Sequence, residues 1–308
     1  MEIELLTGTT ARALAFSTPL IWAAMGEIFA ERSGVVNLGV EGMMILGAVT
    51  GFIAAQSSGD PWLGLLAAAM TGGVVGLFHA FAAVTLRANQ YVSGLAITIF
   101  GLGLSGLLGR KWVGRPLFDS MEPFDLPLLS DIPIIGPALF TDQHALAYLA
   151  LLVSVLLWFV LHHTRAGLVI RTVGESPAAA DTAGRSVTLT RYLSVGFGGV
   201  MAGIGGAYLS LAYRPSWGEG MTNGMGWIAL ALAIFALWDP LRAVGAGLLF
   251  GAFFTLSFRL QDRFPPELLT LLPYVFTILA LILTALGRGK RAFGAPEALG
   301  QAYSRGER

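Results

Sequence analysis

The chain is dominated by long apolar stretches that are separated by short polar or glycine-rich segments. A helix needs about 20 apolar residues to cross a bilayer core of about 30 Å. Stretches that meet or approach this length predict nine crossings, at 12–30, 35–55, 62–86, 88–109, 144–163, 191–213, 225–238, 241–259 and 267–286. The stretch 225–238 is short and has the length of a half-span. The pattern therefore predicts an all-α, polytopic membrane helix bundle of about nine (eight to ten) transmembrane helices, with residues 1–308 forming one transmembrane domain.

Three polar segments set the expected orientation of this bundle. Residues 110–143 are acidic and hold five prolines, which predicts an irregular external loop. Lys and Arg gather in the cytoplasmic loops of membrane proteins. If segment 164–190 is cytoplasmic, most of the 19 Lys and Arg residues fall on that side, including those of a cytoplasmic tail at 287–308. We therefore expect a cytoplasmic C-terminus and, with nine crossings, an external N-terminus.

Composition narrows the classes of function. Hydrophobic residues make up 55% of the chain and charged residues 12%, against about 45–50% and about 25% in soluble domains. The net charge is zero, so no face for nucleic acid is expected. The sequence has no phosphate-binding loop, metal-ligand spacing or hydrolase motif, and no cysteine. We therefore expect no catalytic residue, no metal and no cofactor. Of the classes of membrane protein, a pore or a carrier remains as the expected function.

Two glycine-rich helix entries carry buried polar groups. Asn37 and Glu41 lie in Gly34-Val-Val-Asn-Leu-Gly-Val-Glu-Gly-Met-Met44, and Asn223 and Trp227 lie in Gly218-Glu-Gly-Met-Thr-Asn-Gly-Met-Gly-Trp227. Interrupted helices at matching places in two halves point to an inverted repeat with the substrate path between them, and the residues expected to line or shape that path are Asn37, Glu41, Asn223 and Trp227. Two hypotheses stay open for Glu41, which either lines the path or caps backbone N–H groups of the break. Coincidence in a chain with 40 glycines is the alternative for the repeat itself.

Asn89 lies at the start of the segment 88–109. Two hypotheses stay open for it: the side chain caps a helix, or it lies in the substrate pathway. In the predicted cytoplasmic loop, Ser176 is a good N-cap, Pro177 a good first-turn residue and Gly184 a good helix stop. A helix this short is marginal in water, so it should be held by contacts with a partner. The residues expected to take part are Gly174, Glu175, Ser176, Pro177, Ala179, Ala180, Asp181 and Gly184.

These motifs resemble those of a known family of permease subunits. The string Glu31-Arg-Ser-Gly-Val-Val-Asn-Leu-Gly-Val-Glu-Gly-Met-Met44 is similar to the signature of bacterial nucleoside-type ABC importers, which belong to the branched-chain amino acid and ribose permease family. Asn89-Gln-Tyr-Val-Ser-Gly94 and Val173-Gly-Glu-Ser-Pro177 resemble later motifs, the second being the family's cytoplasmic coupling helix. The resemblance covers about residues 12–286. One departure is Leu237, where relatives often place glycine before the tryptophan.

The resemblance implies a type II ABC importer permease for nucleosides in the bacterial cytoplasmic (inner) membrane. It implies three partners within that bilayer complex: a separate ATP-binding subunit, a second related permease and an external substrate-binding lipoprotein. Simple sugars and branched-chain amino acids are alternative substrates. From a different class, an ion-coupled secondary carrier would have to use the scarce intramembrane acids, mainly Glu27 and Glu41.

Small-residue helix faces suit tight contacts between subunits, and a heterodimer with the second permease is favoured over a homodimer. The two candidate faces are Gly199, Gly203 and Gly206, and Gly245, Gly247 and Gly251; packing inside this subunit is the alternative for both.

Overall fold

The computed structural model describes residues 2–133, 135–261 and 294–305, with isolated positions between 264 and 282. The described part of the chain is helical, with isolated β-bridges as its only extended pairing. The α-helices are α1 (Glu2–Arg32), α2 (Val40–Ser58), α3 (Pro61–Ala80), α4 (Gln90–Gly109), α5 (Ala145–His163), α6 (Arg165–Glu175), α7 (Pro177–Thr182), α8 (Val187–Tyr208), α9 (Met225–Phe235) and α10 (Pro240–Leu260). One-turn π-helical segments are η1 (Phe81–Thr85), η2 (Gly136–Phe140) and η3 (Leu209–Tyr213).

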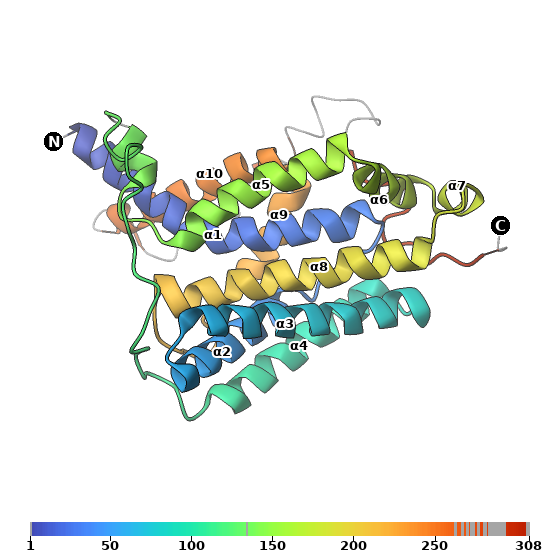
Figure 1. Cartoon of the computed structure of the whole chain (residues 1–308), viewed down its shortest axis with the longest axis horizontal. Coiled ribbons are helices and arrows are strands. Elements are labelled where there is room, and N and C mark those ends of the chain that lie inside the picture. The colour runs from blue at the N-terminus through green and yellow to red at the C-terminus, as the bar shows by residue number, and fades with distance from the viewer. Residues whose placement is uncertain are drawn as a thin grey trace.

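The all-α membrane bundle predicted from the sequence is confirmed. In the described residues, seven helices are long and apolar enough to cross a membrane, and α9 is a shorter apolar helix of 11 residues. The predicted crossing at 267–286 lies outside the described residues, so the count of nine stays a prediction. The long helices lie roughly along one axis, and the two termini lie at opposite ends of the bundle (Figure 1).

Several helices begin where a capping side chain precedes a proline. Asp60 accepts a hydrogen bond from the Trp62 N–H ahead of α3, and Asp239 accepts one from the Arg242 N–H ahead of α10. Ser176 does the same for α7, as predicted. These side chains satisfy backbone donors that the first helical turn leaves without partners, and proline at the first position has no N–H to satisfy.

The helix α8 lies at the centre of the bundle and is held by glycines. A Cβ on Gly206 would come within 1.8 Å of the Met44 carbonyl oxygen of α2, and one on Gly199 within 2.1 Å of the Gly72 oxygen of α3. The helices therefore approach until their backbones touch. The small-residue face of Gly199, Gly203 and Gly206 therefore packs against helices of this same chain. This corrects the prediction that the face contacts a second subunit.

The second predicted face, formed by Gly245, Gly247 and Gly251, is packed at two positions and open at the third. Gly251 and Gly247 of α10 pack against Ala13 and Ile21 of α1, whereas no atom lies within 4 Å of a Cβ built on Gly245. Only Gly245 of this set is therefore open to a neighbouring molecule.

The irregular segment 110–143 covers the end of the bundle where α4 finishes. The Leu117 N–H donates to the Pro215 carbonyl oxygen at 2.8 Å, and the Gly114 N–H to that of Trp217 at 3.1 Å. Trp217 is buried against Gly109, the last residue of α4. This segment therefore fixes the point at which the chain leaves η3 and starts toward α9.

Candidate functional site

Glu41, in the first turn of α2, joins the two helix breaks. One of its carboxylate oxygens accepts hydrogen bonds from the Thr222 hydroxyl at 2.6 Å and the Gly224 N–H at 3.0 Å. The other accepts from the Gly226 N–H at 2.7 Å. Glu41 is 3% exposed, and Gly226 is required because any Cβ there would lie 2.6 Å from the Glu41 backbone. The carboxylate thus caps the start of α9, where the helix dipole favours negative charge.

Asn37 organises the other side of the same junction. Its amide nitrogen donates to the Glu27 carboxylate of α1 at 2.8 Å, and its oxygen accepts from the Gly39 N–H at 3.1 Å. Asn37 and Glu27 are both fully buried. The two acids named for an ion-coupled carrier, Glu27 and Glu41, are therefore bound to the helix breaks themselves.

The helices that start at this junction run in opposite directions. The helix α2 runs toward the end that segment 110–143 covers, where Gly59 lies near Asp119. The helix α9 runs toward the end of α1, where Arg32 binds the carbonyl oxygens of Leu237 and Trp238. Two helix N-termini that meet inside the bundle and diverge are what an inverted repeat would produce.

The segment between Trp217 and α9 is non-helical, although it runs alongside the apolar helix α4. Along α4, Gly109 packs on Trp217, Gly106 lies beside the Glu219 carboxylate, and Gly101 packs on Gly42, next to Glu41. From Gly109 to Gly101 the helix axis rises about 12 Å. Non-helical backbone at membrane depth is tolerated only inside protein or against a water-filled cavity.

One side of this segment is open. Glu219 and Asn223 are exposed, and no atom lies within 4 Å of a Cβ built on Gly218 or Gly220. An exposed carboxylate at this depth requires water or a partner. Glu219 was not among the pathway residues predicted from the sequence, although a charge flanked by two glycines in an apolar setting is a signal that could have found it.

The remaining predicted pathway residues are placed as follows. Asn223 adopts a left-handed backbone with φ of 43°, and its side chain is exposed. Trp227 is partly buried in the first turn of α9. Asn89 caps α4 by accepting hydrogen bonds from the Tyr91 and Val92 N–H groups, at 3.0 and 3.1 Å. The structure therefore brings Glu41 and the segment of Asn223 and Trp227 together. The Asn89 side chain caps α4, and the next residue, Gln90, accepts a hydrogen bond from the Val36 N–H of the first break at 2.8 Å.

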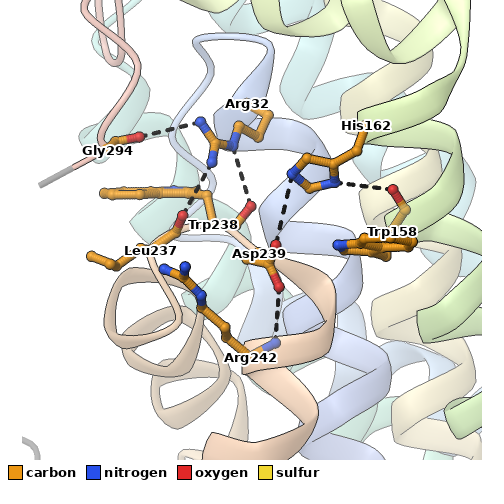
Figure 2. A network of polar contacts seen from close by, with 8 residues as sticks. All are labelled: Arg32, Trp158, His162, Leu237, Trp238, Asp239, Arg242 and Gly294. Carbon is orange, nitrogen blue, oxygen red and sulfur yellow. Dashed lines mark hydrogen bonds and ion pairs between the residues drawn. The ribbon is translucent and has the colours of Figure 1, made fainter.

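The far end of α9 is tied to α1 through a polar network (Figure 2). Leu237 and Trp238 both have left-handed backbones, with φ of 56° and 54°, and Arg32 holds their carbonyl oxygens at 3.1 and 3.2 Å. The Trp238 indole N–H donates to Glu31. A left-handed φ favours glycine, so the leucine and tryptophan here hold a backbone conformation that L side chains rarely adopt. Asp239 continues the network, with its second oxygen 3.7 Å from His162 of α5.

The short helix predicted between Ser176 and Gly184 is present with its predicted cap and stop. The helix α7 (Pro177–Thr182) follows the Ser176 cap, and Gly184 closes it with φ of 74°. It protrudes at the end of the bundle opposite the N-terminus (Figure 1). Ala179 is exposed, whereas Ala180 is buried. Just before it, Gly174 lies against the Arg32 carbonyl, where a Cβ would come within 2.1 Å of the oxygen.

Comparison with known proteins identifies the family. The family described as "Branched-chain amino acid transport system / permease component" matches residues 9–281. The chain belongs to this family. The permease is 38% identical to the guanosine ABC transporter permease protein NupQ of Bacillus subtilis, over 99% of both chains. It is 38% identical to the nucleoside ABC transporter permease protein NupC of Lactococcus lactis, over 95% of both chains. No solved structure matches the permease.

A third relative carries a different substrate name. The permease is 38% identical to the putative glucose ABC transporter permease protein TsgC13 of Haloferax volcanii, over 94% of this chain and 95% of the relative. Each of the three organisms also has a more distant match with a parallel name, namely NupP, NupB and TsgB13, at 26%, 26% and 29% identity.

Family membership decides the class of function. The chain is the permease subunit of an ABC importer, a transport component rather than an enzyme, and a multi-pass membrane protein. The ABC family implies a bilayer and an ATP-binding subunit. The ion-coupled secondary carrier is therefore set aside.

Proposed function

We propose that this permease forms one half of an ATP-driven path for nucleosides across the bacterial cytoplasmic membrane. The observation that carries the proposal is the open, non-helical segment 218–224, which presents Glu219 and Asn223 beside α4. Non-helical backbone at membrane depth has to contact water or protein. We therefore expect the open side of this segment to face a water-filled path that a second subunit completes.

Nucleosides and glucose, the substrates named for the relatives at 38% identity, share vicinal hydroxyl groups. The Glu219 carboxylate accepts hydrogen bonds, and the Asn223 amide accepts and donates them, so both suit sugar hydroxyls. Two of the three names favour nucleosides. Simple sugars are the second candidate, and branched-chain amino acids, named in the family description, are the third.

Uptake into proteoliposomes distinguishes these substrates. The permease would be reconstituted with its second permease, ATP-binding subunit and external binding lipoprotein. We expect ATP-dependent uptake of labelled guanosine that excess unlabelled nucleoside suppresses and that excess glucose or leucine leaves intact. Uptake of glucose or leucine with no uptake of guanosine would reject the nucleoside assignment.

The second permease is proposed to be a different chain. The matches in each of the three organisms come as pairs, one at 38% identity and one below 30%, which supports a heterodimer of unlike permeases. Reconstitution without the second permease should abolish uptake. Robust ATP-dependent uptake by this permease with only the ATPase and the binding protein would establish a homodimer instead.

The orientation follows from the position of α7. We propose that α7 docks on the ATP-binding subunit, so that residues 164–190 and the tail are cytoplasmic, and that the end covered by 110–143 faces the external lipoprotein. The exposed Ala179 lies on the docking side. A membrane-impermeant thiol reagent should label Ala178→Cys only in inside-out vesicles and Asp119→Cys only in right-side-out vesicles. The opposite pattern would reverse the orientation.

A further inference from the structure

A segment near the C-terminal end, residues 294–305, packs back onto the bundle; we call it the tail strap. Its Ala298 N–H donates to the Gly174 carbonyl oxygen at 2.9 Å, and its Gly300 N–H donates to that of Gly34 at 3.1 Å. Gly174 immediately precedes the Glu175–Ser176 entry to α7, and Gly34 lies in the break between α1 and α2. The tail strap therefore joins the two segments by main-chain hydrogen bonds.

A buried arginine fixes the same connection from the α8 side. Arg191 is 1% exposed, and its guanidinium donates to the Ser33 carbonyl oxygen at 3.2 Å and to that of Gln301 at 2.9 Å. A buried guanidinium is costly unless it is hydrogen-bonded. The Arg191 side chain thus binds both the break and the tail strap.

The other end of the tail strap holds α7. Tyr303 packs against a small apolar cluster that consists of Ala180 of α7, Val173 and Val187. The Arg305 guanidinium lies 3.0 Å from the Asp181 carboxylate. Asp181 is therefore occupied by the tail of its own chain.

Polar grooves flank α7, and the tail strap forms a wall of each. One, of about 590 Å³, runs between Asp181, Arg185 and Arg305. The other, of about 400 Å³, runs between Ser176 and Glu297. A helix of six residues has little stability of its own, so the contacts that support it decide its position.

We infer that the tail strap positions the coupling helix and carries its displacement to the break between α1 and α2, with Tyr303 as the positioning residue. The inference rests on the proposed docking role of α7. A displacement of α7 pulls on Tyr303, and the rigid main-chain contacts of Ala298 and Gly300 pass it to Gly34. Coupling between sites travels through such contiguous packed contacts.

The test compares three variants of the full permease in its reconstituted complex. Tyr303→Ala removes the ring, Tyr303→Phe keeps it, and Gln301→Ala removes only a hydrogen bond within the tail strap, to the Glu297 carbonyl oxygen. Hydrogen exchange of the amides in 177–184 reports the hold on α7 and does not depend on the substrate. Substrate uptake per ATP hydrolysed reports coupling.

With Tyr303→Ala we expect exchange in 177–184 to accelerate by about tenfold, because the buried ring area is lost, and uptake per ATP to fall severalfold while the ATPase still co-purifies. Tyr303→Phe and Gln301→Ala should match the wild type in both. Arg305→Asp, a change at an exposed side chain, should shift both readouts in the direction of Tyr303→Ala.

Unchanged exchange in Tyr303→Ala and Arg305→Asp would overturn the inference. So would faster exchange with unchanged uptake per ATP. Failure of the wild-type complex to transport guanosine would reject the nucleoside proposal and leave the exchange result standing.

Discussion

The Glu41 carboxylate accepts a 2.6 Å hydrogen bond from Thr222, which lies 181 residues later in the chain. This contact joins the start of α2 to the approach of α9, and the Gly224 and Gly226 N–H groups complete the set of donors. One buried carboxylate therefore holds two interrupted segments at one depth in the bundle. The pathway proposed here depends on that junction, since it fixes where segment 218–224 runs.

Replacing Glu41 should destabilise the junction in a graded way. Glu41→Ala leaves three donors without this acceptor, two of them buried, and should cost about 3 kcal/mol, whereas Glu41→Gln keeps one carbonyl oxygen and should cost less. Thr222→Val removes a single donor and should cost about 1 kcal/mol. Thermal unfolding in detergent gives the order. Equal unfolding temperatures for Glu41→Ala and the wild type would show that the carboxylate does not hold the junction.

The glycine contacts of α8 predict a contrast between two equivalent substitutions. Gly206→Ala places a methyl group 1.8 Å from the Met44 oxygen, so α8 and α2 must separate. Such overpacking should cost about 1–3 kcal/mol. Gly103→Ala in α4 meets no atom within 4 Å and should be neutral or stabilising by up to about 1 kcal/mol. The difference in unfolding temperature measures the effect, and similar values for both variants would refute the proposed backbone contact.

The left-handed backbone at Leu237 predicts which residues this position accepts. Leu237→Gly removes strain of about 1 kcal/mol and should retain fold and transport despite the lost side chain. Leu237→Val adds a β-branched side chain at a φ of 56° and should lower the unfolding temperature. A variant order with valine above glycine would show that the backbone there differs from the one described.

The docking role of α7 predicts a separation of folding from coupling. Ala179 is exposed, so Ala179→Trp should insert and fold normally but weaken co-purification of the ATP-binding subunit and lower uptake. The matched control is Ser57→Trp, an exposed position at the end of α2 beside segment 110–143, which should leave the ATPase bound. Undiminished ATPase association in Ala179→Trp would place the docking surface elsewhere.

Local sequence signals predicted much of the fold and less of the site. The apolar stretches located the long helices, and the Ser176–Pro177 and Gly184 pattern bounded α7 to within two residues, because capping and left-handed glycine are local effects. The partner of Glu41 was not predictable, since the contact spans distant parts of the chain and depends on the packing of α2 against α9. The same reason applies to the glycines of α8, whose spacing indicates a close contact but not which helix makes it.

If segment 218–224 lines a water-filled path, its side chains are accessible to water-soluble thiol reagents, and the absence of native cysteine allows a direct test. Cysteine would be placed at Glu219 and Asn223, with Asn37, fully buried, and Met70, on the exposed apolar face of α3, as controls. In the assembled importer a small water-soluble alkylating reagent should label Glu219→Cys and Asn223→Cys, at rates that change with the nucleotide state and fall in the presence of nucleoside. Asn37→Cys and Met70→Cys should stay unlabelled. Absence of labelling at both Glu219→Cys and Asn223→Cys in every nucleotide state would contradict a water-filled path along this segment, because the segment would then lie in dry packing.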